Sequence, residues 1–185
     1  MTDDAGRLRS ICVFCGASPG NDPAYAAAAG VLGRELATRS TELVTGGGRV
    51  GLMGVVADAA LGAGGRVTGV IPLSLEEREV AHRGLTTLHV VETLHERKAL
   101  MHELSDAFIA LPGGFGTLDE LFETITWAQL GIHAKPIGLV NVSGYFDDLL
   151  AFLDGATVQG FVSEVNRDLV AVHSDVATLL DALSR

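Results

Sequence analysis

Short runs of hydrophobic residues alternate along this chain with longer stretches in which hydrophobic residues recur at helical spacing. Short uninterrupted apolar runs are typical of strands buried on both faces of a parallel sheet. The runs predict strands at residues 11–15, 42–45, 66–71, 87–91, 107–111, 137–141 and 169–173. The periodic stretches predict helices at residues 23–39, 51–61, 93–104, 118–130, 146–158 and 176–183, with a polar connection at residues 73–84.

Strands that alternate with helices in this way indicate βαβ units, a parallel sheet and right-handed crossovers. The predicted fold is therefore α/β: a single Rossmann-like, doubly wound domain over residues 1–185, with helices on both faces of the sheet. Residues 1–9 are expected to form a flexible N-terminus. Ligands of such sheets bind beyond the carboxyl ends of the strands, so the loops that follow the strands are the candidate binding segments.

Three of these loops are rich in glycine: residues 16–18 (Gly-Ala-Ser), 45–54 (Thr-Gly-Gly-Gly-Arg-Val-Gly-Leu-Met-Gly) and 112–117 (Pro-Gly-Gly-Phe-Gly-Thr). Neighbouring loops of a doubly wound sheet converge on one crevice. Glycines there let backbone N–H groups approach a ligand closely. The candidate binding residues of these loops are Ser18, Gly46, Gly47, Gly48, Met53, Gly113, Gly114, Phe115, Gly116 and Thr117.

The loop at residues 112–117 leads into the helix predicted at residues 118–130. A helix N-terminus offers unpaired N–H donors and the positive end of a dipole, so phosphate is its natural ligand. Glu120 would then lie about one helical turn from that phosphate. A second interpretation stays open, because Thr117-Leu118-Asp119-Glu120 also has the spacing of a capping box. In that case Thr117 and Glu120 would only bind free N–H groups of their own helix.

Charged residues open the helix predicted at residues 93–104, in the order His95-Glu96-Arg97-Lys98. The simplest interpretation is a solvated first turn, which suits Lys98. Arg97 becomes a candidate ligand of phosphate or carboxylate if this helix borders the crevice, because guanidinium is a preferred partner of both groups.

The two cysteines, Cys12 and Cys15, form a C-x-x-C pair, which could serve as a redox pair or as half of a metal site. Residues three apart in an extended strand point to opposite faces. The sequence contains no second pair that would complete a zinc site. Both residues are therefore predicted to be buried, reduced thiols with a structural role.

Composition excludes several classes of function. The formal net charge of −10 argues against nucleic acid as a partner, since duplex binding requires a basic surface. No apolar run is long enough to span a membrane, and residues 1–9 lack the apolar stretch of a signal peptide, so we expect a cytoplasmic protein. The sequence has neither a G-x-x-x-x-G-K-[ST] motif nor a G-x-G-x-x-G after its first strand, and its histidines show no metal-ligand spacing.

Residues 112–120 (Pro-Gly-Gly-Phe-Gly-Thr-Leu-Asp-Glu) resemble the PGGxGTxxE motif of the Lonely guy family, which older catalogues describe as lysine decarboxylase-like. The resemblance also takes in residues 45–54, 69–72, 97–98, 125–133 and 144–147, and it covers about residues 10–165 in unbroken order. Departures are Phe115 where tyrosine is common, Thr45 where serine is common and Leu94 where methionine is common. None of them removes a proposed functional group.

The resemblance implies a cytokinin riboside 5′-monophosphate phosphoribohydrolase. Such an enzyme cleaves the N-glycosidic bond of an N6-modified adenosine monophosphate (AMP) and releases free base and ribose 5-phosphate. By the motif match Arg97 and Glu120 would be the catalytic pair, and residues 113–117 would hold the phosphate. Glu79, Lys98 and Thr126 match further substrate-binding positions. The family needs no metal or organic cofactor.

Two other functions remain open at this point. A decarboxylase normally needs pyridoxal phosphate on a lysine, but Lys135 precedes Pro136 at the end of the predicted sheet opposite the crevice, which leaves only Lys98. A non-catalytic nucleotide-binding module would use the same loops, with Glu120 only as a helix cap. The sequence does not distinguish AMP from its prenylated relatives as the substrate.

A homodimer is expected on two grounds. The smaller members of the Lonely guy family are dimers, and the length of this chain resembles theirs. In addition, Gly131-Ile132-His133 follows a helix that carries Trp127 and Leu130, and the mean hydropathy of the chain is +0.34. These features suggest more apolar surface than a monomer easily buries.

Overall fold

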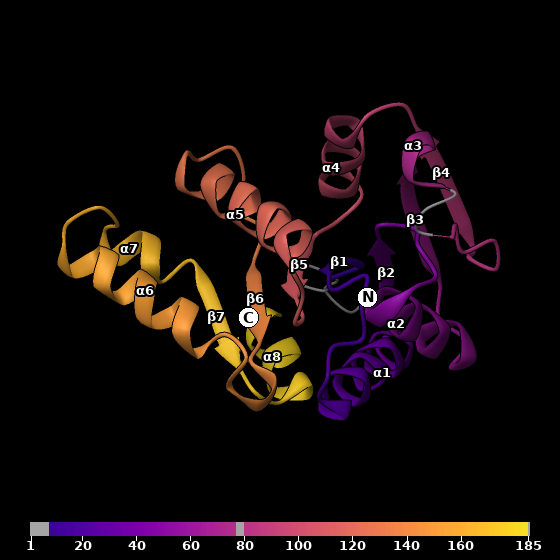
Figure 1. Ribbon diagram of the computed structural model, residues 1–185, viewed down its shortest axis with the longest axis horizontal. Helices are drawn as coiled ribbons and strands as arrows, with labels where there is room; N and C mark the ends of the chain where they lie inside the picture. The colour runs from indigo at the N-terminus through magenta and orange to yellow at the C-terminus, as the bar shows by residue number, and fades with distance from the viewer. Residues whose placement is uncertain (1–7, 77–79, 185) are drawn as a thin grey trace, which may run out of the picture.

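The computed structural model describes residues 8–76 and 80–184. Every strand within these ranges belongs to one parallel sheet of seven strands, in the order β4-β3-β2-β1-β5-β6-β7 (Figure 1). The strands are β1 (Ser10–Phe14), β2 (Glu42–Thr45), β3 (Val67–Pro72), β4 (Thr87–Val91), β5 (Ala107–Ala110), β6 (Ile137–Val140) and β7 (Val170–His173). The predicted Rossmann-like α/β fold is confirmed.

The helices are α1 (Pro23–Thr38), α2 (Gly51–Gly62), α3 (Leu73–Glu76), α4 (Leu94–Glu103), α5 (Phe115–Gln129), α6 (Asp147–Val158), α7 (Glu164–Arg167) and α8 (Val176–Leu183), with a 3-10 turn, η1 (Val142–Gly144). Side-chain caps fix several starts: Asp22 accepts from the Ala24 N–H at 2.8 Å, and Thr93 accepts from the Glu96 N–H at 3.1 Å. Within the described ranges, no helix has both the length and the apolar character needed to cross a membrane.

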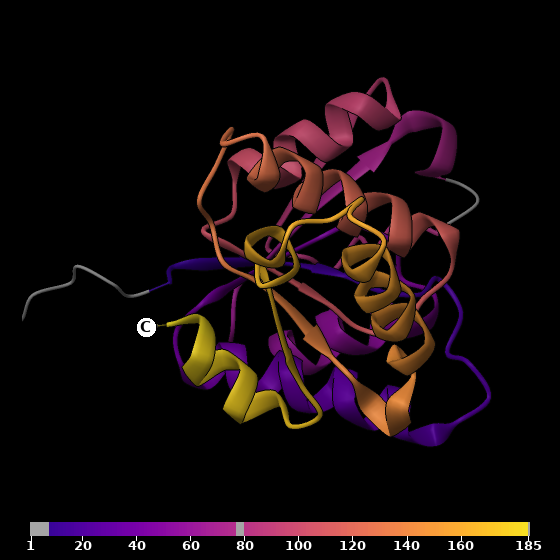
Figure 2. The same cartoon turned by 90° about the vertical axis from the view of Figure 1, so that its left-hand side faces the viewer.

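Helices cover both faces of the sheet, so its five inner strands are largely buried, whereas the edge strands β4 and β7 are only partly buried. Figure 2 shows α1 (indigo) and α8 (yellow) below the strands, and α4 and α5 (pink to orange) above them. Residues of β1 alternate between the two cores: Ile11 and Val13 pack with α1, α2 and α8, whereas Cys12 and Phe14 pack with residues such as Phe108. This burial on two faces explains why the strands appear in the sequence as uninterrupted apolar runs.

The two cysteines are both free and buried. Cys12 belongs to the core under α4 and α5, and Cys15 belongs to the core under α1 and α2. Their side chains therefore lie on opposite faces of the sheet, as the strand geometry predicts. The prediction of buried, reduced thiols is confirmed.

The position of β1 in the sheet determines where a ligand can bind. β1 pairs with β2 on one side and with β5 on the other, with Phe14 opposite Ala110 near the carboxyl ends. The chain extends outward from β1 through β2, β3 and β4, and then crosses to β5 on the opposite side of β1. This change of direction is a topological switch point, where loops diverge and leave a crevice beyond the strand ends.

The structure departs from the sequence prediction in a few places. α5 begins at Phe115 rather than at residue 118, and the connection at residues 73–84 contains the short helix α3. The short helix α7 was not predicted. Glu79 lies outside the described residues, as do residues 1–7. Arg9, however, is tied to the residue before β5 through its N–H, which donates to Asp106 Oδ2 at 2.8 Å.

Candidate functional site

A cavity of about 440 Å³ lies beyond the carboxyl ends of β1 and β5, at the topological switch point. Its walls come from the loop after β1, the starts of α1, α2 and α5, the helix α4 and the residue that follows η1. The lining residues are Cys15, Gly16, Ala17, Ser18, Pro19, Gly20, Tyr25, Leu52, Met53, Arg97, Pro112, Gly113, Gly114, Gly116, Thr117, Glu120 and Tyr145. The predicted convergence of the first and third glycine-rich loops on one crevice therefore holds in the structure.

The first turn of α5 faces this cavity with free donors. Gly114 is the N-cap residue, and no described side chain makes a capping hydrogen bond there. Gly113 packs so closely on Thr117 Oγ1 and the Gly16 backbone that a Cβ atom would overlap both. The loop can therefore pack in this way only with glycine at this position. Free N–H groups and the positive end of the α5 dipole make it an anion site.

The capping-box interpretation of Thr117 and Glu120 is wrong. Because α5 begins at Phe115 with Gly114 as its N-cap, Thr117 lies inside the first turn and Glu120 in the second. Neither side chain occupies the position from which a capping box bonds the helix N-terminus. Both line the cavity instead, so the sequence motif positions ligand-facing groups rather than a helix cap.

A second helix start meets the same cavity. α2 has Val50 as its N-cap residue, and the described residues provide no side-chain cap for it. The Leu52 N–H donates to the Gly16 carbonyl at 2.9 Å, which fixes the loop after β1 against α2. Leu52 and Met53 then line the cavity from the first turn of α2. Two helix dipoles thus direct their positive ends toward one space.

Arg97 reaches the cavity from α4 and is almost completely buried, with 6% of its surface exposed. Its Nη2 donates to the Gly46 carbonyl at 3.0 Å. A Cβ atom at Gly46 would overlap the guanidinium, so glycine is required for this contact. Gly46, Gly47 and Gly48 do not line the cavity themselves. Gly46 supports the arginine that does, which is a different role from the predicted contact with substrate.

The charges of Arg97 and Glu120 also act on the thiol at the bottom of the cavity. Burial raises the pKa of Cys15 far above its usual value, the Glu120 carboxylate raises it further, and the Arg97 guanidinium lowers it. Both charged groups therefore lie within electrostatic range of the end of β1. A thiol in this state is protonated and unreactive at neutral pH.

Among residues 8–76 and 80–184, no group of three or more His, Cys, Asp or Glu side chains could hold a metal ion. The chemistry that the described cavity offers consists of backbone donors, one guanidinium, one carboxylate and hydroxyl groups. Such a set can bind a phosphate at one end and stabilise positive charge at the carboxylate.

Comparison with known proteins shows the family of this chain. The model of a family described as "Possible lysine decarboxylase" matches residues 53–183. The chain belongs to this family. The match includes α4, the loop after β5 and α5, and the resemblance to the Lonely guy family seen in the sequence is confirmed.

Two plant members of the family illustrate the similarity. A cytokinin riboside 5′-monophosphate phosphoribohydrolase of Arabidopsis thaliana is 51% identical over 183 residues, which cover 99% of this chain and 84% of that protein. One of rice, Oryza sativa subsp. japonica, is 52% identical over 164 residues, which cover 89% of this chain and 68% of that protein. The similarity therefore extends over both halves of the sheet.

Solved structures of lower identity share the fold. A molybdenum cofactor carrier protein of Chlamydomonas reinhardtii superposes with a TM-score of 0.71 at 24% identity, covering 95% of this chain and 96% of that one. A molybdenum cofactor binding protein of Rippkaea orientalis gives a TM-score of 0.71 at 24% identity, with 95% of each chain covered. At this identity the likeness concerns the fold alone.

Three motif positions of the family lie outside the cavity in this chain. Lys98 forms ion pairs with Asp119 and Glu123, each at 3.1 Å. Burial alone would lower the pKa of Lys98, but its bonds to these two carboxylates raise it overall. Thr126 borders a separate apolar cavity of about 130 Å³ between α5 and α6, and Phe115 is 93% exposed.

Two tyrosines of the site had no assigned role in the sequence analysis. Tyr25 on α1 and Tyr145 after η1 both line the cavity, and their rings meet edge to face with centroids 5.5 Å apart. Neither belongs to a glycine-rich loop, so the pattern of these loops did not indicate them. For Tyr145 the one available signal was its position in the family-like segment Gly144-Tyr145-Phe146-Asp147.

Proposed function

We propose that this protein hydrolyses the N-glycosidic bond of a nucleoside 5′-monophosphate of the cytokinin riboside type, releasing free base and ribose 5-phosphate. One observation carries the proposal: Glu120, Arg97 and the uncapped start of α5 line a single cavity. The proposal is supported by the two relatives, 51% and 52% identical, that are named cytokinin riboside 5′-monophosphate phosphoribohydrolases. The reaction proposed for these residues proceeds without a metal or organic cofactor. Two buried, free thiols are compatible with the cytoplasmic location that we also propose.

The glycine-rich loop binds the 5′-phosphate in this proposal. The start of α5 presents backbone and hydroxyl donors from Gly113, Gly114, Gly116 and Thr117, and the adjacent loop after β1 adds the hydroxyl of Ser18. Charge-assisted bonds of this kind fix the ribose relative to the protein. The binding energy of the phosphate then lowers the barrier at a bond that lies elsewhere in the substrate.

Glu120 acts on the ribose in this proposal. Cleavage of an N-glycoside passes through a state with oxocarbenium character, in which positive charge develops on the sugar. A carboxylate in a sheltered cavity stabilises that charge or activates the attacking water. Glu120 lies in the second turn of α5, one turn beyond the donors proposed to hold the phosphate, and this spacing supports a role for it at the ribose.

Arg97 supplies positive charge on the same cavity wall in this proposal. Its guanidinium stabilises negative charge on the phosphate or on the departing base. Glu79, Lys98 and Thr126 remain candidate substrate contacts on the strength of the family motif. In the described residues Lys98 already forms ion pairs with Asp119 and Glu123, which leave one of its three N–H donors for another partner.

The glycine that supports Arg97 allows a specific prediction. The substitution Gly46→Ala should displace the guanidinium and lower kcat/KM for AMP by at least about tenfold, because misplacing a catalytic group by an ångström can cost that much or more. The displaced group is the end of a flexible side chain, so the melting temperature should change little. Steady-state kinetics and thermal melting measure the two effects.

Gly62→Ala is the matched control for this variant, because nothing lies within 4 Å of a Cβ atom at Gly62. We expect it to retain the activity of the natural protein. If Gly46→Ala also retained full activity, the contact with Gly46 would not hold Arg97 in its active position.

The direct test of the proposed function is product analysis. The protein is incubated with AMP and with isopentenyladenosine monophosphate, and the released base and ribose 5-phosphate are quantified by chromatography. Release of base in equimolar amount with ribose 5-phosphate supports hydrolysis. Binding of AMP without release of base would instead identify a non-catalytic nucleotide-binding module. Comparison of the two initial rates establishes which substrate is preferred.

The decarboxylase alternative has no suitable lysine. Lys98 and Lys135 are the only lysines of the chain. Lys98 is bound by two carboxylates, and Lys135 Nζ donates to the His102 carbonyl at 2.7 Å, outside the residues that line the cavity. Neither amine is presented to the space where pyridoxal phosphate and a substrate would have to meet.

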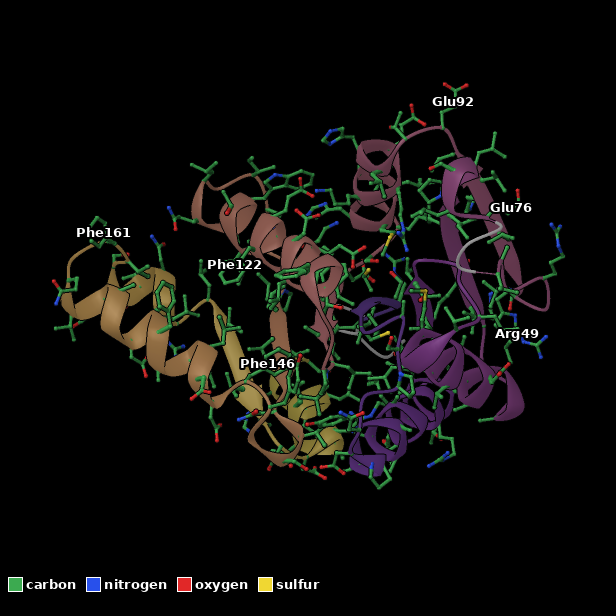
Figure 3. All side chains as sticks on the ribbon, viewed as in Figure 1. Arg49, Glu76, Glu92, Phe122, Phe146 and Phe161 are labelled. Atoms are coloured by element: carbon green, nitrogen blue, oxygen red, sulfur yellow. The ribbon has the colours of Figure 1, made fainter. Side chains whose placement is uncertain are left out.

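We further propose that the protein is a homodimer in solution. Apolar side chains stand exposed around α6 and α7, among them Val158 (84%) and Phe161 (89%), and Phe161 projects at the outer end of the α6–α7 connection (Figure 3). Leu130 and Ile132 add exposed apolar surface after α5. Light scattering at micromolar concentration should give twice the 19.3 kDa mass of the chain. A mass near that of one chain would contradict the proposal.

A further inference from the structure

Tyr145 contacts the loop that is proposed to bind phosphate. Its hydroxyl donates to the Gly113 carbonyl at 2.6 Å, a short distance for such a bond. The two residues are far apart in sequence, since Gly113 follows β5 and Tyr145 follows β6. The bond therefore ties the loop at the start of α5 to a separate segment of the fold.

The segment before Tyr145 is built to present this side chain. Ser143 and Gly144 both adopt positive φ values, 53° and 71°, which turn the chain sharply after β6. Asn141 Nδ2 donates to Asp147 Oδ1 at 2.7 Å, and the Phe146 N–H donates to Asn141 Oδ1 at 2.8 Å. These bonds close the turn around Tyr145, so its position is fixed by the backbone and not by the tyrosine itself.

Neighbouring rings orient the Tyr145 side chain. Phe146 is buried in the core and meets the Tyr145 ring edge to face at 5.0 Å. Tyr25, which lies on α1, packs edge to face against the Tyr145 ring. Tyr145 itself remains 41% exposed, so its hydroxyl could be hydrated without any partner in the protein. The bond to Gly113 is therefore not required to compensate for burial.

The geometry of the peptide group gives this bond a consequence for ligand binding. The Gly113 carbonyl and the Gly114 N–H belong to one planar trans peptide, so they point in opposite directions. Glycine lets such a peptide rotate at little cost, because both flanking residues have wide conformational freedom. A rotated peptide would turn a carbonyl oxygen toward a bound phosphate in place of an N–H donor.

We propose that Tyr145 is a positioning residue that holds the Gly113–Gly114 peptide in the orientation in which its N–H serves the phosphate. The inference rests on the proposed function only in assigning a phosphate to this loop. The hydroxyl acts through the peptide and needs no contact with the substrate. Loss of the bond leaves the peptide free to rotate, and the affinity for phosphorylated ligands falls.

The test compares the natural protein with Tyr145→Phe, which removes the hydroxyl and keeps the ring. Calorimetry with ribose 5-phosphate should show a dissociation constant roughly three- to tenfold higher in the variant, the effect of one net hydrogen bond. The dissociation constant of adenine, which carries no phosphate, should agree within about twofold between the two proteins. Equal affinities for ribose 5-phosphate would overturn the proposal, and so would an equal loss for both ligands.

Tyr25→Phe is the matched comparison, because Tyr25 is the only other tyrosine and its hydroxyl makes no hydrogen bond to the described residues. It should weaken ribose 5-phosphate binding less than Tyr145→Phe does. An equal loss would show that any hydroxyl in the cavity has the same effect, and would overturn the role of the peptide.

The Gly114 amide signal in 15N-correlated NMR spectra supplies a second readout. Addition of ribose 5-phosphate should shift this signal clearly in the natural protein and less in Tyr145→Phe.

The outcomes separate this inference from the proposed function. A natural protein that binds ribose 5-phosphate more tightly than Tyr145→Phe does, but releases no base from AMP, would retain the positioning role and lose the hydrolase. A natural protein that releases base from AMP at the same KM as Tyr145→Phe would retain the hydrolase and lose the positioning role. A natural protein with no affinity for ribose 5-phosphate would overturn the positioning role whatever its activity.

Discussion

Replacing Glu120 with glutamine should remove most of the hydrolysis of AMP and leave the fold intact. The carboxylate is proposed to stabilise the positive charge that develops on the ribose. Because this interaction is made only in the transition state, kcat should fall with little change in KM. Loss of such a group commonly lowers the reaction rate about 10²- to 10⁴-fold. Quantification of released adenine under saturating AMP measures the effect.

The stability of Glu120→Gln should be close to that of the natural protein for two reasons. Glutamine has nearly the same shape and helix propensity as glutamate. In addition, the N-cap of α5 is Gly114, so Glu120 has no capping role to lose. Glu103→Gln is the matched control, because Glu103 is an exposed glutamate on α4 away from the cavity. Equal turnover of the Glu120 and Glu103 variants would exclude Glu120 from the chemistry.

Adenosine should be a far poorer substrate than AMP. If residues 113–117 hold the 5′-phosphate at the start of α5, the nucleoside loses several charge-assisted bonds at once. The expected loss is on the order of 3 kcal/mol in kcat/KM, or roughly 10²-fold. The measurement is the initial rate with each compound under identical conditions, over a range of concentrations that gives kcat/KM.

Two further comparisons sharpen this prediction. Adenosine diphosphate and triphosphate should also react poorly, because a loop shaped around one phosphate leaves the added charge unpaired. Inorganic phosphate and ribose 5-phosphate should compete with AMP. Equal kcat/KM values for adenosine and AMP would mean that the loop binds another group, and the assignment of the cavity to a nucleotide would be withdrawn.

The strands and the loops that follow them could be predicted because a strand buried on both faces is an uninterrupted apolar run in the sequence. A strand such as β5 is apolar throughout, so its carboxyl end, and the loop that follows it, could be located within a residue. The start of α5 was placed too late, because Thr117 and Glu120 have the spacing of a cap. Glycine is a poor helix former, so Gly114 and Gly116 did not indicate that the first turn of α5 begins at Phe115.

The contributions of distant residues could not be read from the sequence. Tyr145 reaches Gly113 only because β6 lies beside β5 and the chain turns sharply after it. The Gly46 carbonyl accepts a hydrogen bond from Arg97, 51 residues further along the chain, and local residue spacing cannot indicate such a contact. For Lys98 and Thr126 the motif predicted a role in binding, whereas the fold places their side chains among other partners.

The central position of β1 has a consequence for how the protein is made. β1 is synthesised before both of the strands that pair with it, and one of its two edges is filled by β5, which is synthesised almost a hundred residues later. Until then its outer edge is an open template of unpaired N–H and carbonyl groups. Pairing with β2 does not cover this edge, because β2 and β5 lie on opposite sides of β1, so the edge can pair with another chain until β5 is made. The complete cavity forms only after Tyr145 has been synthesised, since its lining residues extend from Cys15 to Tyr145.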